Sequence, residues 1–449
     1  MDSLSFADRM QAGKALRQQI SRAAQAEWQH GKQRRDPIEV LEASNAGRLP
    51  ELIPIRYGRM LRNPFAFLRG APAVMACDLA MTPTMGVHVQ ACGDCHLVNF
   101  GLFASPERNL IFDVNDFDET LRAPWEWDLK RLAASFVVAG RLNGFAEERC
   151  ADLARAAGRS YRQHLYEFAQ LSPLDVFYFR VNATDLVEIE RTEKARDARA
   201  QMIEKARNRV GTHLFPKITE EVGGRRQFIE NPPIITRVTD EAQLAMIRQG
   251  LVDYRQTLSD DRRFMFDRYR LEDFARRVVG VGSVGTRCYV ALLVCDDTNP
   301  LLLQIKEARR SVLEPFAEKC PYQTQGQRVV AGQRLMQAAS DVFLGWLRGG
   351  DGADYYVRQL RDMKFSIPVE DLGACSLERY AEICGWTLAR AHAKGGDAAT
   401  ISGYLGRGDN FDEALSKFAV AYADQTEADH TALVNARRDG RIEVCEENL

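Results

Sequence analysis

The chain has 449 residues, of which 45% are hydrophobic and 27% are charged, as in an average globular protein. Its 60 basic and 62 acidic residues give a net charge of −2, so charge alone indicates neither nucleic acid nor a membrane as a partner. The N-terminus lacks the apolar core of a signal peptide, and no apolar run of about 18 residues occurs. The ten scattered cysteines are typical of reduced thiols. We therefore expect a folded cytoplasmic protein with several structural units.

Four segments follow one another along the chain. Residues 1–55 are predicted to form an N-terminal helical arm, because apolar positions recur at helical spacing. Residues 56–270 combine strand-like runs with long helices. Residues 271–365 are β-rich: an apolar run, a glycine turn and two more apolar runs precede a helix and two further strands. Residues 366–449 are again helical, so the predicted fold class is α+β.

The segment at residues 56–70, RYGRMLRNPFAFLRG, is both basic and aromatic. We expect Phe65, Phe67 and Leu68 to pack the end of a helix into a core. The basic residues of this segment could meet an anionic acceptor, although such residues more often simply lie in solvent.

The densest set of polar residues between apolar runs lies at residues 87–120. Asp94 precedes Asn99 by five positions, and Asp116 follows a second apolar run. A phosphoryl-transfer site needs a group that orients or deprotonates the acceptor hydroxyl, together with oxygen ligands for Mg²⁺. We therefore expect Asp94 to be catalytic and Asn99 and Asp116 to hold Mg²⁺. The alternative is that these residues only form turns around strands.

Two further carboxylates lie near Asp116. Asp113 and Asp118 are spare, and either could replace Asp116 as the metal ligand. Because Asp118 follows directly in the NDFDE turn, it is included in the predicted metal set with Asn99 and Asp116.

A glycine-rich motif, G-x-G-x-x-G, occurs at Gly280, Gly282 and Gly285, where missing Cβ atoms let backbone amides approach phosphate oxygens. A strand pattern follows it, rather than the helix of a Rossmann fold, which favours the glycine-rich hairpin of kinases over a plain turn. Lys306 ends an apolar strand about 20 residues later, where kinases hold the lysine that contacts the α- and β-phosphates. We expect these glycines, Ser283 and Lys306 to bind the phosphates of ATP.

Kinases pair this lysine with a glutamate. Glu314 and Glu318 lie close after Lys306, whereas the helix predicted over residues 327–339 contains no acidic residue. The sequence therefore does not identify the partner.

Two resemblances bear on these motifs. GDCHLVNF followed by IFDVNDFDE resembles the G-D-x-H-x-x-N and I-D-[FW] motifs of aminoglycoside phosphotransferase-like kinases, and WEWDL resembles the helical aspartate that follows them. The chain from about residue 56 to 438 also resembles the bacterial family called domain of unknown function 2252, through NPFAFLRG, CGDCHLVNFG, DFDET, PWEWDLKRLAAS, GVGSVGTRCY, YVRQLRDMK and AYADQTE. That family name carries no activity, so the kinase resemblance supplies the functional expectation.

The kinase resemblance implies a two-lobed protein kinase-like fold. In ordinary kinases the glycine loop and the lysine precede the catalytic loop, whereas here they follow it. We expect a circular permutation in which the small lobe, residues 271–365, is inserted after the large-lobe core and residues 366–449 return to the large lobe. By the same resemblance, His96 belongs with Asp94 to the predicted catalytic set, where it orients the loop through hydrogen bonds; the alternative is a direct role in the chemistry. Asp128 is expected to be a structural carboxylate behind the loop.

The expected function is an ATP- and Mg²⁺-dependent phosphotransferase acting on the hydroxyl group of a small molecule rather than of a protein. The alternatives are a non-catalytic nucleotide-binding regulator, or pseudokinase, which the unclear glutamate favours, and a nucleotidyltransferase on the same fold. All three require Lys306 and Asp116 to lie within the reach of one triphosphate, roughly 10 Å. The acceptor is not predicted, because kinase-like folds host many substrates.

A rival interpretation concerns Cys92, Cys95 and His96, which form C-x-x-C-H, the pattern of covalent c-type haem attachment. Haem c needs an exported chain, and the sequence shows no export signal. Zinc would need further ligands, and no second C-x-x-C occurs. A serine hydrolase is disfavoured because the chain has no G-x-S-x-G motif.

Overall fold

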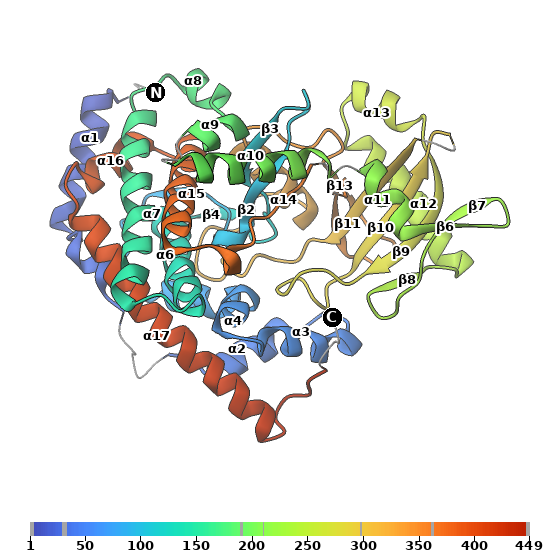
Figure 1. The fold of residues 1–449 in the computed structure, drawn as a ribbon, viewed down its shortest axis with the longest axis horizontal. Coiled ribbons are helices and arrows are strands. Elements are labelled where there is room, and N and C mark those ends of the chain that lie inside the picture. The colour runs from blue at the N-terminus through green and yellow to red at the C-terminus, as the bar shows by residue number, and fades with distance from the viewer. Residues whose placement is uncertain are drawn as a thin grey trace.

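The computed structural model describes residues 4–28, 34–188, 192–209, 211–296, 299–360 and 363–445. They form a mixed α+β structure in which most long helices gather at one end and the largest sheet lies at the other (Figure 1). The predicted α+β class is therefore confirmed. Within the described ranges, no helix combines the length and the apolar character needed to cross a bilayer.

Four long helices form the core of the helical half: α6 (Trp125–Leu142), α7 (Glu147–Phe168), α15 (Ala374–Gly395) and α17 (Asn410–Arg438). Apolar residues recur at three and four positions along α6, and Leu129 and Phe136 are fully buried. Helix α7 packs against α15, and α17 packs against both α6 and α7. Segments from both ends of the sequence therefore share one hydrophobic core.

The N-terminal arm extends beyond the expected boundary at residue 55, and its helices include α1 (Phe6–Ala15), α2 (Pro37–Ser44), α3 (Ile53–Met60) and α4 (Pro64–Gly70). The side chains of Asp36 and Asn63 cap α2 and α4 by accepting hydrogen bonds from first-turn amides, and a proline follows each cap. Phe65, Phe67 and Leu68 are each at most 2% exposed, as the sequence predicts. Further elements outside the largest sheet are α5 (Pro72–Leu79), α8 (Pro173–Tyr178), β5 (Val181–Asn182), α9 (Ala183–Glu188), α10 (Glu193–Arg207) and α16 (Ala398–Leu405).

Two antiparallel strand pairs hold the polar stretch: β1 (His88–Ala91) with β4 (Leu121–Pro124), and β2 (Phe100–Ala104) with β3 (Leu110–Val114). Ala91 pairs with Leu121, and Phe100 pairs with Val114. This register places the loop between β1 and β2, residues 92–99, directly beside the turn between β3 and β4, residues 115–120. We call them the 92–99 loop and the acidic turn.

The largest sheet is antiparallel, with six strands in the order β12-β13-β11-β10-β9-β8. Its strands are β8 (Ile235–Arg237), β9 (Arg270–Arg277), β10 (Cys288–Val294), β11 (Pro300–Glu307), β12 (Gly345–Arg348) and β13 (Asp354–Gln359). The glycine loop, residues 278–287, joins β9 to β10. Lys306 lies near the end of β11, and α14 (Gln325–Met336) comes between β11 and β12. The element order agrees with that expected from the sequence.

The unit around this sheet starts earlier than the expected boundary at residue 271. The hairpin of β6 (Thr219–Val222) and β7 (Arg225–Phe228) and the helices α11 (Gly211–Ile218), α12 (Glu241–Gln256) and α13 (Asp260–Phe266) also belong to it. Phe215 and Phe228 share one hydrophobic cluster with strands of the sheet, and Leu251 and Tyr254 share another. The sequence missed this because β8 has only three residues, too few to show a strand period.

After β13 the chain returns to the helical half. Phe365 exchanges two backbone hydrogen bonds of 2.9 Å with Leu102 in β2. The end of α15 then lies against β1, so closely that a Cβ atom at Gly395 would be 2.9 Å from the Cβ of Gln90. The C-terminal helices and the strands of the polar stretch are therefore parts of one body.

A buried ion pair joins β3, α15 and the end of α14. Arg390 Nη2 donates to Asp113 Oδ1 at 2.5 Å, and both side chains are 1% exposed. The second guanidinium nitrogen donates to the Met336 carbonyl at 2.6 Å, while Asp113 Oδ2 accepts from the Ala338 amide at 2.8 Å. All of these groups are desolvated, so each depends on its partner.

Arg390→Met should lower the free energy of unfolding by about 3–5 kcal/mol, because it leaves the Asp113 carboxylate buried without its cation. Urea denaturation followed by tryptophan fluorescence would measure the change. The double variant with Asp113→Leu should recover part of the loss, since an apolar pair replaces the ions. Arg438→Met, at a surface ion pair, is the matched control. Equal urea midpoints for Arg390→Met and the control would contradict this role.

Candidate functional site

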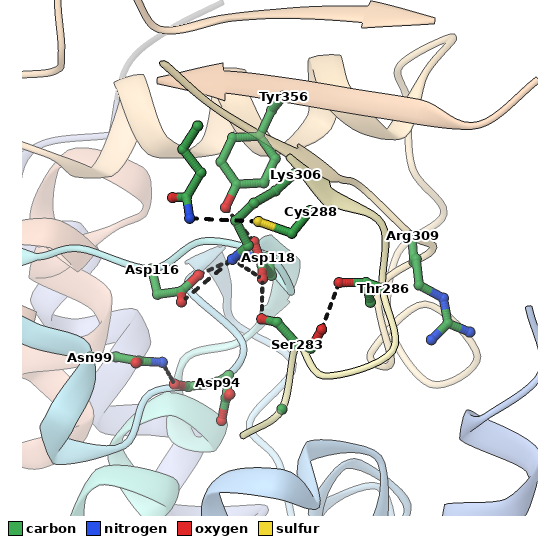
Figure 2. Close-up of polar contacts among 12 residues, drawn as sticks. Asp94, Asn99, Asp116, Asp118, Ser283, Thr286, Cys288, Lys306, Arg309 and Tyr356 are labelled. Atoms are coloured by element: carbon green, nitrogen blue, oxygen red, sulfur yellow. Dashed lines mark hydrogen bonds and ion pairs between the residues drawn. The ribbon is translucent and has the colours of Figure 1, made fainter. Parts of the chain in front are cut away.

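A cavity of about 370 Å³ lies where the N-terminal arm, the 92–99 loop, the acidic turn and the glycine loop meet. The predicted site residues that line it are Asp94, His96, Asn99, Asp116, Asp118, Gly280, Gly282 and Ser283. Two predicted residues do not line it. Gly285 packs on the arm beside Arg48, and Lys306 lies behind the acidic turn, 3% exposed. The structure thus brings together residues that are far apart in the sequence (Figure 2).

Asp94 is held by one of its two carboxylate oxygens. Arg131, on α6, donates from Nε to Asp94 Oδ1 at 2.6 Å. Oδ2 lies 3.9 Å from the His96 Nε2 atom, too far for a hydrogen bond. Burial raises the pKa of Asp94, although Arg131 acts in the opposite direction. The geometry leaves Oδ2 available to a hydroxyl group in the cavity.

The Asn99 side chain is oriented by the same loop. Its Nδ2 donates to the Asp94 carbonyl at 2.8 Å (Figure 2). Its backbone amide donates to the His96 carbonyl, and its carbonyl accepts from the Asn115 amide in the acidic turn. Because Nδ2 is engaged, Oδ1 is the atom free to act as an oxygen ligand.

In the acidic turn, the two carboxylates that line the cavity, Asp116 and Asp118, differ in the hydrogen bonds that they accept. Asp118 Oδ2 accepts from Lys306 Nζ at 2.6 Å and from Ser283 Oγ at 3.2 Å, and its Oδ1 accepts from the Tyr356 hydroxyl at 2.7 Å (Figure 2). Asp116 Oδ2 is 4.0 Å from Lys306 Nζ, and Asp116 Oδ1 receives only a long bond of 3.4 Å from the Asp118 amide. Asp116 therefore keeps oxygens that could bind a metal ion, whereas both oxygens of Asp118 are occupied.

The ion pair of Asp118 has a large electrostatic effect. Burial acts to raise the pKa of Asp118, but the Lys306 ammonium group outweighs it and lowers that pKa to about 2. The pKa of Lys306 is in turn raised well above its ordinary value by Asp116 and Asp118, against the effect of burial. Both groups are thus charged at neutral pH.

The backbone of the acidic turn is held by cations of the large sheet and of α14. Arg328, 1% exposed, donates to the Thr120 carbonyl at 2.6 Å and to the Asp118 carbonyl at 2.9 Å. Arg358 donates to the Asn115 carbonyl at 3.0 Å. The positions of the turn's carboxylates are therefore set by elements more than 200 residues later in the sequence.

Glycine is required at two positions of the glycine loop, since Gly280 and Gly285 have φ angles of +68° and +87°. Arg48, in the arm, donates hydrogen bonds to the carbonyls of Gly282 and Val284 in the loop, at 2.9 and 2.5 Å. Among the described residues, the amides of Gly282 and Ser283 donate to no acceptor. Those amides are free to meet an anion.

His96 contributes differently from its expected role. Its backbone, not its ring, makes the hydrogen bonds of the loop: its amide donates to the Asp94 carbonyl at 2.8 Å. The ring is 4% exposed, and Nδ1 has no partner in the described chain. Burial, with Arg69 and Arg131 nearby, keeps its pKa well below the ordinary value, so the ring is neutral. The expectation of ring hydrogen bonds was wrong.

Asp128 lies behind the 92–99 loop. Its two carboxylate oxygens accept from the amides of Cys92 and Gly93 at 2.7 and 2.9 Å, and His392 contacts it at 3.3 Å. The sulfur atoms of Cys92 and Cys95 lie within 4.8 Å of this carboxylate. Burial raises the pKa of Cys95 to about 11, which disfavours the thiolate that a metal ion would need, and both Asp128 oxygens already accept hydrogen bonds from backbone amides. Asp128 therefore stabilises the backbone of the 92–99 loop.

Sequence reasoning missed several residues of the site. It left the acidic partner of Lys306 open, and the structure assigns Asp118 to it. Tyr356 was not found because only the pairing of β11 with β13 places it opposite Lys306. Arg131 had a detectable signal, since it lies three residues after Asp128 on one helix face. Asp113, expected as a spare metal ligand, instead lies outside the cavity in the ion pair with Arg390.

The family described as uncharacterized proteins conserved in bacteria (DUF2252) matches residues 48–436. No curated protein and no solved structure matches the chain significantly. The matched range contains both loops of the cavity, the glycine loop, Lys306 and the arm from Arg48 onward. The chain therefore belongs to the bacterial DUF2252 family.

Proposed function

We propose that this protein is an ATP- and Mg²⁺-dependent phosphotransferase that acts on a hydroxyl group. The observation that carries the proposal is that the glycine loop, Asp94, Asn99 and Asp116 line one cavity, with Lys306 directly behind the acidic turn. The distance between Lys306 Nζ and Asp116 Oδ2 is 4.0 Å. One triphosphate reaches roughly 10 Å, so a single nucleotide can contact both.

The arrangement of elements supports a kinase-like fold with a permuted order. The glycine hairpin, the lysine strand, a helix and two strands follow one another in the large sheet, which serves as the small lobe. The end of α15 lies against β1, just ahead of the 92–99 loop. A chain joined at that point would run from the helix directly into the loop, as the resemblance to kinases implies.

The oxygen atoms present fit Mg²⁺, which prefers carboxylate and carbonyl ligands. Asn99 Oδ1 and the carboxylate of Asp116 would hold the ion, because neither is committed to a strong hydrogen bond. When bound, Mg²⁺ neutralises charge on the transferred phosphate. Asp118 is assigned a different task from the one expected: it holds Lys306 in the position that a helix glutamate holds in kinases.

The remaining roles follow from the free atoms of the site. Asp94 Oδ2 orients the acceptor hydroxyl and takes up its proton, while Arg131 fixes the carboxylate through Oδ1. The amides of Gly282 and Ser283 and the ammonium group of Lys306 receive phosphate oxygens.

One observation favours a second candidate, a non-catalytic nucleotide-binding regulator. Helix α14 contains no acidic residue, so Lys306 has no glutamate partner on it. Incubation with ATP labelled at the α- or the γ-phosphate separates the candidates: γ-label enters product in phosphoryl transfer, α-label in nucleotidyl transfer, and neither in a regulator. Absence of Mg·ATP binding to the wild-type protein in calorimetry would refute all of them.

Asp94→Asn should lower kcat by about 10²–10⁴-fold while leaving the Kd for Mg·ATP unchanged, because the amide cannot accept the hydroxyl proton. Turnover of γ-labelled ATP and calorimetry measure the two quantities. Asp260→Asn, on the surface of α13, is the matched control. A loss of nucleotide binding equal to the loss of turnover would show that Asp94 has a structural task instead.

Asp116→Asn should raise the Mg²⁺ concentration needed for half-maximal ATP binding by at least about tenfold, the scale on which even outer-shell changes affect metal sites. The amide keeps the shape of the side chain but removes its charge. Titration of Mg²⁺ at fixed ATP, followed by thermal shift, measures the effect, again with Asp260→Asn as control. An unchanged Mg²⁺ dependence would remove Asp116 from the metal site.

A further inference from the structure

The arm side of the cavity carries cations that the roles above do not use. Arg56 and Arg69, from α3 and α4, and Arg309, from the segment after β11, all line the cavity. Arg309 donates only to backbone carbonyls, those of Ser44 and Ala46. We call these three residues the arginine cluster. None of them has a carboxylate within ion-pair distance in the described chain.

Arg69 is the least satisfied of the three. Its guanidinium carbon lies 5.8 Å from the centroid of the Phe65 ring. Its Nε is buried and has no hydrogen-bond acceptor among the described residues. Burial lowers the pKa of Arg69, and the Asp94 carboxylate, which lines the same cavity, acts against that effect.

Arg56 also lacks a charged hydrogen-bond acceptor, and it is buried in the wall of the cavity. It is 1% exposed, and its acceptors are neutral: the Asn45 side chain and, at 2.9 Å, the Gly70 carbonyl. Its Nε is buried without a partner. Burial lowers its pKa to about 10, and Arg309 nearby acts in the same direction. Cations held together in this way need an anion to offset their desolvation and mutual repulsion.

The phosphates of ATP already have partners of their own in the proposed function. Lys306, the amides of Gly282 and Ser283, and Mg²⁺ at Asp116 receive them, and none of these roles uses the arginine cluster. The arginine cluster is therefore available to the other participant, the acceptor. Guanidinium groups suit planar, paired contacts to phosphate and carboxylate oxygens.

We infer that the arginine cluster binds an oxyanion of the acceptor, so that the substrate is a small hydroxyl compound carrying a phosphate or carboxylate group. This rests on the proposed phosphotransferase function, with the hydroxyl at Asp94 and the oxyanion at Arg69. The anion fixes the acceptor at one end and presents its hydroxyl at the other, which gives the orientation that transfer requires.

Binding to the nucleotide-free, full-length protein tests this inference. Inorganic phosphate and acetate, titrated separately at constant ionic strength and followed by calorimetry and thermal shift, represent the two anion classes. At least one should bind to the wild type, and Arg69→Gln should weaken that binding by about tenfold or more. Mg·ATP affinity should be unchanged in the variant. Arg248→Gln, at an exposed arginine that is paired with Glu241 and does not line the cavity, is the matched control.

Lys306→Met separates the anion site from the nucleotide site: it should lose ATP binding and keep phosphate binding. Arg309→Gln gives a second variant of the cluster and should weaken phosphate binding as well. The inference is overturned if the wild type binds neither anion, or if phosphate binding survives Arg69→Gln and is lost in Lys306→Met. If phosphate binding is lost in Lys306→Met but not in Arg69→Gln, and the wild type binds ATP normally, the inference fails but the proposed phosphotransferase function is retained. Anion binding at Arg69 without any ATP binding would instead refute the proposed function alone.

Discussion

The ion pair between the buried Lys306 ammonium group and the partly exposed Asp118 carboxylate is the contact on which the rest of the site depends. An isolated charge in a protein interior costs several kcal/mol, so Lys306 is not stable there without a carboxylate partner. Lys306 comes from the large sheet and Asp118 from the acidic turn, and Arg328 and Arg358 add bonds from the same sheet and its helix to the backbone of the turn. The position of Asp116 beside them is therefore a product of both halves of the molecule.

The arm has a comparable effect on the other wall of the cavity. Arg48 and Arg59 donate to carbonyls of the glycine loop and so fix its backbone against the arm. Gly282 approaches the arm so closely that a Cβ atom there would lie 3.2 Å from the Arg69 carbonyl. The arm thus shapes the glycine loop and also supplies Arg56 and Arg69 to the cavity.

Local patterns in the sequence were enough to find Asp94, Asn99, Asp116 and the glycine motif, because each belongs to a short run whose spacing reflects one turn or hairpin. Their proposed tasks stay predictions. What depended on distant pairing was out of reach: the choice of Asp118 as the lysine's partner, and the start of the sheet unit near residue 211, which β8 completes with three residues. Contacts across 188 residues leave no periodicity to detect.

The order of the site residues along the chain has a consequence for its synthesis on the ribosome. Asp118 emerges 188 residues before Lys306, and at typical elongation rates that interval lasts roughly 10–40 s. During this time the acidic turn carries its carboxylates without their counter-charges, and β1 lacks α15 beside it. The N-terminal half therefore cannot complete its core while it is being translated. Because the last helices close the same core, assembly is delayed until the whole chain has left the ribosome.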